Sequence, residues 1–341
     1  MPDRRLLASL ALARSAYDRA SERRADADFL AAAWAGRTPA RLLLLRDGSV
    51  PVDDDGLVLV APSAYAGSPG VQVLLGIDDG IAYLALLAPE QGPPPVPSEV
   101  SEATEPAVTP VVLDGQDTAA PDRVVLPADV RWATLREVGA GLGARDSGLM
   151  TTAVALANWH RAYPRCPRCG TPTAAADAGW SRRCPADGSQ HFPRHDAAVI
   201  VLVLDGADRA LLGRRADWEP GWYSTLAGFV EAGESAEMTV VREMAEEAGV
   251  RIDPDRIDYL GSQPWPFPSS LMLGYHAGVA AGSPAARADG VEIAEVRWFT
   301  REELAAGCAD GSVRIPPAVS IARRLVEHWY GAPLPGSWSR P

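Results

Sequence analysis

The chain has 341 residues, of which 47% are apolar and 22% charged, and its formal net charge is −12. This profile is typical of a globular protein with two or three domains. No lysine occurs in the sequence, which excludes a Schiff-base or Walker lysine, and the acidic balance argues against broad, sequence-independent binding of nucleic acid.

The sequence pattern of residues 1–87 predicts a small α+β domain at the N-terminus. It opens with apolar side chains at helical spacing, from Leu6 through Leu10 and Ala13 to Tyr17, which favours an amphipathic helix over a signal peptide. Strand-like runs such as RLLLLRDG and IAYLALLAP follow, separated by turn residues. No apolar run reaches the roughly 18 residues that span a membrane, so we expect a cytoplasmic protein.

A change in composition separates this domain from the rest of the chain. Residues 88–122 are rich in Pro, Glu, Ser and Thr and lack the apolar content to fold, which predicts a disordered insertion. Residues 123–163 should complete the N-terminal region with a buried helix, SGLMTTAVALANWHRAY. At the other end, residues 333–341 are expected to form a loose tail.

Residues 164–193 contain three cysteines with the spacing Cys166-x2-Cys169-x14-Cys184. In a cytosolic protein this pattern favours a small zinc ribbon over disulfides, with a closed, structural metal site. A fourth ligand is needed. His191 is chemically the better candidate, whereas Asp187 stands at the expected position. A degenerate ribbon without metal is the alternative.

The segment GFVEAGESAEMTVVREMAEEAGV, residues 228–250, contains six glutamates. Good helix formers predict a helix from about Ser235 to Ala248, ended by Gly249. The spacing i, i+3, i+4 places three carboxylates on one face, those of Glu243, Glu246 and Glu247. Such a cluster suits a hard divalent cation, Mg²⁺ or Mn²⁺.

Four apolar side chains lie roughly on the opposite side of this predicted helix and are available for the core: Met238, Val241, Ala245 and Ala248.

The same segment fits the pattern G-x5-E-x7-R-E-U-x-E-E-x-G-U, where U is a bulky apolar residue, and resembles the Nudix box with no departure. The resemblance implies an α/β/α sandwich around a mixed sheet over residues 194–332. It also implies hydrolysis of a nucleoside diphosphate linked to another moiety. By family pattern, Glu243, Glu246 and Glu247 would bind the metals, and Arg242 would orient a glutamate, with Glu246 as the local candidate. The general base stays open.

A second motif, GSQPWPFPSSLM at residues 261–272, concerns the substrate. Its prolines and aromatics suit either stacking on a base or packing inward. It resembles the signature of the NADH pyrophosphatase branch, whose members cut NAD(H) into nicotinamide mononucleotide and AMP, and some of which remove NAD caps from RNA.

This resemblance implies a homodimer and further site residues. Glu292 would be another metal-linked carboxylate, with Glu295 as the alternative. The residues placed at substrate contacts are Phe192, Phe229, Gln263, Trp265 and Ala322.

Three functions are compatible with these motifs. The first is a metal-dependent NAD(H) diphosphatase, the second removal of NAD caps from RNA by the same chemistry, and the third a nucleotide-sensing regulator on an inactive Nudix domain. The intact set of three glutamates argues against the regulator. The motifs do not choose between NADH, NAD⁺ and capped RNA.

Overall fold

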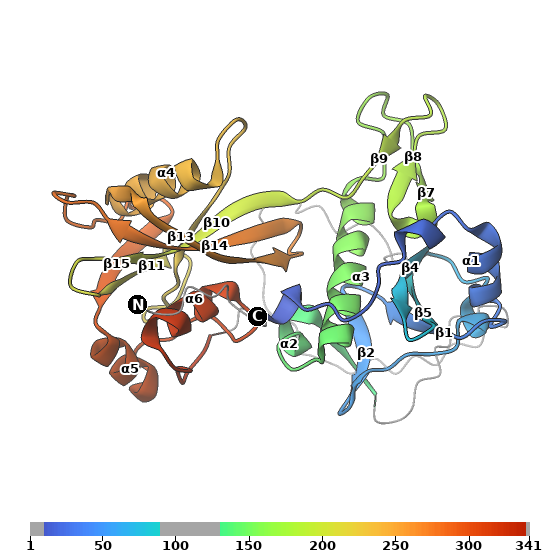
Figure 1. The fold of residues 1–341 in the computed structure, drawn as a ribbon, viewed down its shortest axis with the longest axis horizontal. Coiled ribbons are helices and arrows are strands. Elements are labelled where there is room, and N and C mark those ends of the chain that lie inside the picture. The colour runs from blue at the N-terminus through green and yellow to red at the C-terminus, as the bar shows by residue number, and fades with distance from the viewer. Residues whose placement is uncertain (1–9, 89–129, 339–341) are drawn as a thin grey trace, which may run out of the picture.

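The computed structural model describes residues 10–88 and 130–338 and shows two lobes with a small hairpin unit above one of them (Figure 1). Residues 89–122 of the expected insertion lie outside the described residues. Within the described ranges, none of the helices combines the length and the apolar sequence that crossing a bilayer requires.

The N-terminal lobe is an α+β unit built from two three-stranded sheets, with strand orders β1-β5-β4 and β3-β2-β6. Strands β1 and β5 run parallel, and β4 and β5 antiparallel. Its strands are β1 Ala40–Leu45, β2 Ser49–Asp53, β3 Gly56–Leu57, β4 Val71–Asp78, β5 Ile81–Leu87 and β6 Arg131–Thr134. Its helices are α1 Ala27–Trp34, α2 Leu135–Val138 and α3 Ala144–Ala162. Helix α3 is the expected buried helix, with Leu149, Met150 and Ala153 fully buried.

The expected N-terminal amphipathic helix is wrong over its described part. Residues Ala11–Ala13 form a single 3₁₀ turn. The apolar side chains here do not share one core, because Leu12 is buried in the N-terminal lobe and Leu10 in the C-terminal lobe. The guanidinium of Arg14 donates to the carbonyl oxygens of Ala11 and Gly139. The segment therefore links the lobes in an irregular conformation that helical spacing does not predict.

The cysteine segment forms a three-stranded antiparallel unit with the order β7-β8-β9. Its strands are β7 Ala174–Ala176, β8 Ser181–Arg183 and β9 Gln190–His191. The unit is anchored on the N-terminal lobe by Trp180, whose indole N–H donates to the carbonyl oxygen of Leu74 at 2.7 Å.

The C-terminal lobe has a mixed six-stranded sheet with the order β13-β14-β10-β11-β15, and β12 pairs with β10. Strands β10 and β14 are parallel, and the other pairs are antiparallel. The strands are β10 Asp196–Leu204, β11 Ala210–Arg215, β12 Leu226–Phe229, β13 Ile252–Trp265, β14 Ser270–Val279 and β15 Ile293–Phe299. The helices are α4 Ala236–Ala248, α5 Arg301–Asp310 and α6 Ile321–Tyr330.

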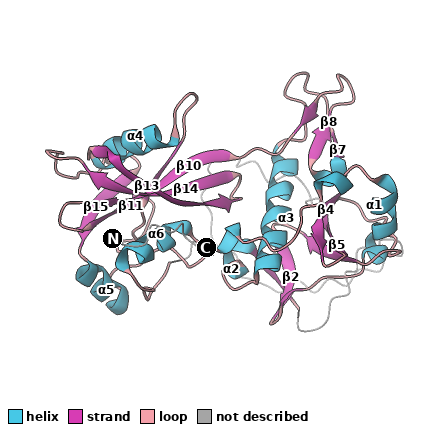
Figure 2. Ribbon diagram, viewed as in Figure 1, coloured by secondary structure: helices cyan, strands magenta, loops and turns pink. Residues whose placement is uncertain are grey.

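Strand β10 shows why helices cover both faces of this sheet (Figure 2). Successive side chains of a strand point to opposite faces, and nearly all of β10 is apolar. Val199 and Val201 pack in the core that contains α4, whereas Ile200 and Leu202 pack in the core that contains α6. The α/β/α sandwich around a mixed sheet, predicted from the resemblance, is confirmed.

The end of the chain is packed, contrary to the expected loose tail, as far as the structure describes it. Leu334 is buried, and the N–H of Trp338 donates to the carbonyl oxygen of Ile315 at 3.1 Å. The buried guanidinium of Arg323 donates to the carbonyl oxygen of Gly336 at 2.7 Å. Leu334, these polar contacts and the Trp338 ring, which stacks on Trp222 with ring centroids 5.4 Å apart, hold this segment. Its short, proline-rich sequence does not reveal them.

Candidate active site

Helix α4 begins and ends where its sequence predicts. The hydroxyl of Ser235 accepts from the Met238 N–H at 3.2 Å, which satisfies one free donor of the first turn. Gly249 ends the helix with a φ of 66°, a left-handed conformation that favours glycine. The predicted limits of Ser235 to Ala248 are confirmed to within the capping residue.

The face that α4 buries differs from the prediction. Met238 is 58% exposed and Ala245 is also exposed. The sheet instead receives Val240, Met244 and Ala248. The helix is thus rotated about its axis relative to the prediction. Glu247, which is only 5% exposed, therefore lies on its buried face. The expected core face was therefore partly wrong, because one glutamate occupies a buried position that an apolar pattern does not predict.

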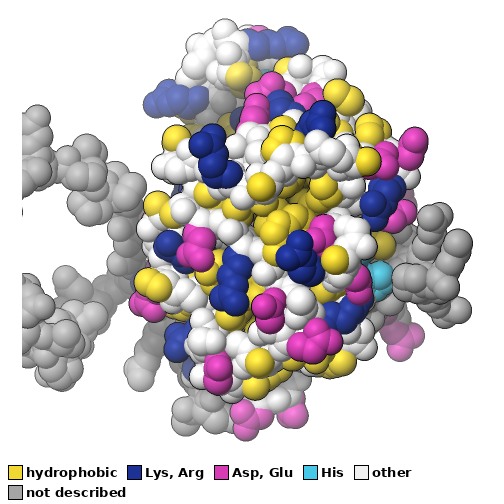
Figure 3. Space-filling view, turned by 90° about the vertical axis from the view of Figure 1, so that its left-hand side faces the viewer, with side chains coloured by type: hydrophobic (Ala, Val, Ile, Leu, Met, Phe, Trp, Pro, Cys, Tyr) yellow, Lys and Arg dark blue, Asp and Glu magenta, His cyan; other side chains and the backbone are white. Residues whose placement is uncertain are grey.

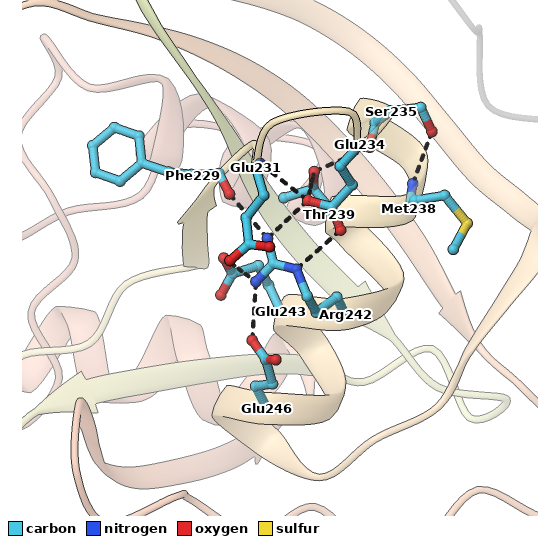
Figure 4. Close-up of polar contacts among 9 residues, drawn as sticks. All are labelled: Phe229, Glu231, Glu234, Ser235, Met238, Thr239, Arg242, Glu243 and Glu246. Atoms are coloured by element: carbon cyan, nitrogen blue, oxygen red, sulfur yellow. Dashed lines mark hydrogen bonds and ion pairs between the residues drawn. The ribbon is translucent and has the colours of Figure 1, made fainter.

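The guanidinium of Arg242 holds the glutamate segment together (Figure 4). It forms a bidentate pair with Glu234, with both N–O distances 2.9 Å. Its Nη1 lies 2.8 Å from Glu243 Oε1 and 2.9 Å from Glu246 Oε2, and its Nη2 donates to the carbonyl oxygen of Phe229 at 3.0 Å. The expected contact with Glu246 is present, but Glu234 is the bidentate partner.

Glu234 is the carboxylate that this arginine fixes most firmly. Hydrogen bonding from Arg242, reinforced by the Thr239 hydroxyl at 2.7 Å, lowers the pKa of Glu234 to about 2. The Glu231 N–H also donates to it at 3.2 Å. Glu234 therefore closes the loop before α4 and is an anchoring group, charged over the whole physiological pH range.

Gly228 makes room for the carboxylate of Glu243. A Cβ at position 228 would lie 1.9 Å from Glu243 Cδ, a distance that no packing can tolerate. Glycine is thus required on β12 for Glu243 to lie against the strand. Burial raises the pKa of Glu243, although Arg242 opposes this shift.

Glu247 is the most buried carboxylate of the segment. Burial, followed by the charges of Glu243 and Glu292, raises its pKa to about 8, and an N–H from Ala227 only partly compensates. Among the described residues, Glu247 Oε2 is buried with no hydrogen-bond partner. A buried, unpartnered carboxylate oxygen close to other carboxylates is costly unless a cation neutralises it. The donor set fits a divalent metal ion with oxygen ligands.

Glu292 is brought towards this group by a short loop. The carboxylate of Asp289 accepts from the N–H groups of Glu292 and Ile293 at 3.1 and 2.8 Å, and the Asp289 N–H donates to the carbonyl oxygen of Glu247 at 3.3 Å. The Glu292 side chain is 60% exposed, and its ion pair with Arg215 is long at 3.7 Å.

Glu295 lies in a different environment from Glu292. It accepts from the Tyr223 hydroxyl at 2.6 Å and from Arg214 Nε at 3.2 Å. The contact with Arg214 joins β15 to β11, and the contact with Tyr223 joins β15 to the segment before β12. Glu295 is therefore paired at shorter distances than Glu292.

Two of the aromatic residues placed at substrate contacts are exposed. Phe229 is 59% exposed at the end of β12, with its ring directed away from the Arg242 cluster (Figure 4). Phe192 is 65% exposed just after β9. Exposed rings at these positions are available for stacking.

The other three residues placed at substrate contacts, Gln263, Ala322 and Trp265, make contacts within the fold. Gln263 is fully buried, donating to the Val319 carbonyl oxygen at 3.0 Å and accepting from the Ile321 N–H at 2.7 Å. Ala322 is 2% exposed. The Gln263 side chain therefore holds the start of α6, Ala322 packs in the core of the C-terminal lobe, and their contact with substrate stays a prediction.

Trp265 packs inward against the N-terminal lobe. It lies edge-to-face on Phe267, with ring centroids 5.0 Å apart, and the guanidinium of Arg136 is 5.1 Å from its ring centroid. Asn158 of α3 donates to the Pro266 carbonyl oxygen at 2.7 Å. Two roles were predicted for this loop, stacking on a base and packing inward. The Trp265 ring packs inward against the N-terminal lobe and is not a free stacking surface.

The ribbon brings together four ligand-bearing residues: Cys166, Cys169, Cys184 and Asp187, whose ligand atoms lie within 4.8 Å of one another. His191 is not in this group, and its Nε2 lies 3.0 Å from the Ser189 hydroxyl. The choice of His191 as fourth ligand is therefore corrected. Asp187 lies in the turn that faces the other cysteines, whereas His191 is already in β9.

Hydrogen bonds favour the ionised form of Asp187. The N–H and hydroxyl of Ser189 donate to Asp187 Oδ1 at 2.9 and 2.6 Å, and they hold its pKa well below the usual range. Three sulfurs and a carboxylate supply the four ligands of a tetrahedral Zn²⁺ site. Cys308 is buried in the C-terminal lobe and takes no part.

Comparisons with known proteins agree with this architecture. A NUDIX domain model matches residues 193–319, an NADH pyrophosphatase zinc ribbon domain matches 161–192, and an NADH pyrophosphatase-like rudimentary NUDIX domain matches 39–159.

Three relatives cover much of the chain. The NAD-capped RNA hydrolase NudC of Mycobacterium bovis (strain BCG / Pasteur 1173P2) is 41% identical over 327 residues, spanning 93% of this chain and 94% of that protein. NAD-capped RNA hydrolase NudC of Stutzerimonas stutzeri is 42% identical over 59% of this chain and 70% of that protein. The human mitochondrial NAD(P)H pyrophosphatase NUDT13 is 38% identical over 57% of this chain and 58% of that protein.

The fold and the glutamate segment define a Nudix hydrolase. With its zinc ribbon domain and its rudimentary N-terminal NUDIX domain, the chain belongs to the NADH pyrophosphatase family of these enzymes.

The different contacts of Glu292 and Glu295 predict different effects of removing each charge. Glu295→Gln should lower the free energy of unfolding by about 1 kcal/mol, because it weakens the pairing with Tyr223 and Arg214, and should leave turnover almost unchanged. Glu292→Gln should leave stability unchanged and lower metal-dependent turnover. Denaturant unfolding and steady-state kinetics on both variants check this. The reverse pattern would assign the metal-linked role to Glu295.

Proposed function

We propose that this enzyme hydrolyses the pyrophosphate bond of NAD(H), yielding nicotinamide mononucleotide and AMP. The observation that carries the proposal is the set of three glutamates on α4: Glu243 and Glu246 pair with Arg242, and Glu247 has a buried, unpartnered oxygen. The substrate class is supported by the family models over residues 39–159 and 161–192 and by the names of the relatives.

Glu243, Glu246, Glu247 and Glu292 are the residues that would hold Mg²⁺ or Mn²⁺. Bound divalent ions offset the charge of a pyrophosphate and lower the pKa of bound water. The chain itself fixes the geometry: Gly228 leaves space for Glu243, Arg242 orients Glu243 and Glu246, and burial excludes water from Glu247. A glutamate would act as the general base.

Phe192 and Phe229 are the residues that would stack on a flat ring of the dinucleotide, since both are exposed. Both rings are large, apolar and exposed to solvent, and a ligand or a second copy of the chain would cover them. We propose that the protein acts as a homodimer, as the family resemblance implies. Three cysteines gathered at a metal-type site, with no disulfide among the described cysteines, support a cytoplasmic location.

Removal of the NAD cap from RNA is the second candidate function. Two relatives that match this chain are NAD-capped RNA hydrolases. The bond that breaks is the same pyrophosphate, so the Nudix site would serve both substrates. The products would be nicotinamide mononucleotide and RNA with a 5′-monophosphate.

Incubation of the pure protein with Mg²⁺ or Mn²⁺ and NADH should yield AMP and reduced nicotinamide mononucleotide, identified by mass. EDTA should abolish the reaction, because the clustered carboxylates alone repel a pyrophosphate. Cleavage at a glycosidic bond, or turnover unchanged by EDTA, would refute the proposed function.

Glu247→Gln should lower turnover by roughly 10²–10⁴-fold, because a lost ligand carboxylate weakens metal binding and activation of water. The matched control is Glu237→Gln, an exposed position in the first turn of the same helix, which should change turnover only slightly. Glutamine is nearly as good a helix former as glutamate, so circular dichroism should be unchanged in both variants. Equal, small effects would show that the buried carboxylate has no catalytic part.

The proposed zinc site involves Cys166, Cys169, Cys184 and Asp187. Purified protein should carry about one zinc per chain, as a single tetrahedral site requires. Asp187→Ala and Cys184→Ser should lower the zinc content and the melting temperature. His191→Ala should keep both, because His191 lies outside the ligand group. Native protein without zinc would show that the ribbon is degenerate and binds no metal. Loss of zinc in His191→Ala but not in Asp187→Ala would make His191 the fourth ligand.

A further inference from the structure

The ribbon and its flanks have the opposite charge from the rest of the chain. Residues 161–194 contain six arginines and two aspartates, whereas the whole chain has a net charge of −12. One of those aspartates, Asp187, belongs to the cysteine cluster. Even with a divalent metal held by three thiolates and Asp187, the segment stays net positive. We propose that this basic ribbon binds the RNA chain that follows an NAD cap, an inference that rests on the proposed function.

Part of this positive charge is available to a polyanion, although Arg194 forms an ion pair with Asp196. Five of the six arginines are exposed: Arg161, Arg165, Arg168, Arg183 and Arg194. Within the described parts of the chain, the side chains of Arg168 and Arg183 have no hydrogen bond or ion pair, so no acidic partner neutralises them. Arg182 is the exception, since it is buried and donates to Thr173.

Aromatic rings accompany these arginines. Tyr163 and Phe192 are 39% and 65% exposed, and Arg194 Nη1 donates to the Tyr163 hydroxyl at 3.2 Å. Proteins bind single-stranded nucleic acid by combining cations that contact the backbone with aromatic side chains that stack on bases. Phe192 is also a proposed contact of the dinucleotide itself, so the exposed arginines beyond it are the part of this surface that only a longer ligand would use.

The basic segment leads directly into the strand beside the proposed active site. Phe192 is five residues before Ala197, a span of at most about 18 Å. The Ala197 carbonyl oxygen accepts from the Val230 N–H at 3.0 Å, and Ala198 is paired with Phe229. A chain that continues from the adenosine of a bound cap can therefore reach Phe192, at the C-terminal end of the ribbon, within a few nucleotides.

The outer face of the C-terminal lobe provides a contrast. Figure 3 shows arginine and acidic side chains intermixed over that face, and the glutamate segment itself contains six glutamates and one arginine. These surfaces give a phosphate backbone no continuous attraction. The ribbon is the better place for the RNA chain.

The test compares two double variants that each remove two exposed arginines. Arg168→Gln/Arg183→Gln changes the ribbon, and Arg37→Gln/Arg41→Gln changes the N-terminal lobe. For each, kcat/KM is measured with a NAD-capped RNA oligonucleotide and with NADH, from about 50 to about 200 mM salt.

The ribbon variant should lose roughly three- to tenfold in kcat/KM for capped RNA, mainly through KM, and retain NADH hydrolysis. Its slope of log kcat/KM against log salt should become shallower by about 0.7 per arginine removed. The control should match wild type with both substrates. Unchanged zinc content and melting temperature in the ribbon variant show that the ribbon remains folded.

Two results would separate this inference from the proposed function. Equal kcat/KM for capped RNA in the ribbon variant and in the control would overturn RNA binding by the ribbon, while NADH hydrolysis would still support the diphosphatase. Wild-type protein that cleaves neither substrate would overturn the proposed function instead.

Discussion

The contacts of the Arg242 guanidinium are the interaction on which the glutamate segment depends. Five donors in a fixed fork allow one side chain to reach Glu234, Glu243, Glu246 and the Phe229 carbonyl oxygen at once. These contacts join the strand, the loop and the helix, and they place positive charge where carboxylates would otherwise repel one another. Lysine could not replace it, because an ammonium group lacks the bidentate geometry that Glu234 uses.

The glutamate segment was the most predictable part of the protein, because its determinants are local. Ser235 and Gly249 mark the ends of α4 by capping chemistry, and spacing places the carboxylates on one helix face. The burial of Glu247 was not predictable in this way. Apolar patterns assume that the core excludes charge, and here the segment keeps a carboxylate buried while Met238 is left exposed. Local rules fail where a site requires an arrangement that is unfavourable without its ligand.

Long-range contacts account for most of what the sequence could not show. Gln263 bonds to residues more than fifty positions away, and a single sequence does not show whether an amide will contact a ligand or the backbone. Trp265 raises the same problem, because the lobe that covers it is distant in sequence. For the zinc ribbon, cysteine spacing pointed to position 187, whereas the preference for imidazole pointed to His191. The structure gathers Asp187 with the three cysteines because it lies in the turn between β8 and β9, whereas His191 lies in β9.

Net charge was the least informative property of the sequence, because the two functional surfaces carry opposite charges. The glutamate segment must be acidic to concentrate divalent cations, and that acidity repels a polyanion at a distance. An enzyme that accepts both a dinucleotide and a capped RNA therefore gains from placing its attraction for phosphates elsewhere. A ribbon with exposed arginines, connected to β10, satisfies this requirement without disturbing the carboxylates. Because exposed charges act within about 10 Å at moderate salt, the two surfaces can differ in sign and still serve one substrate.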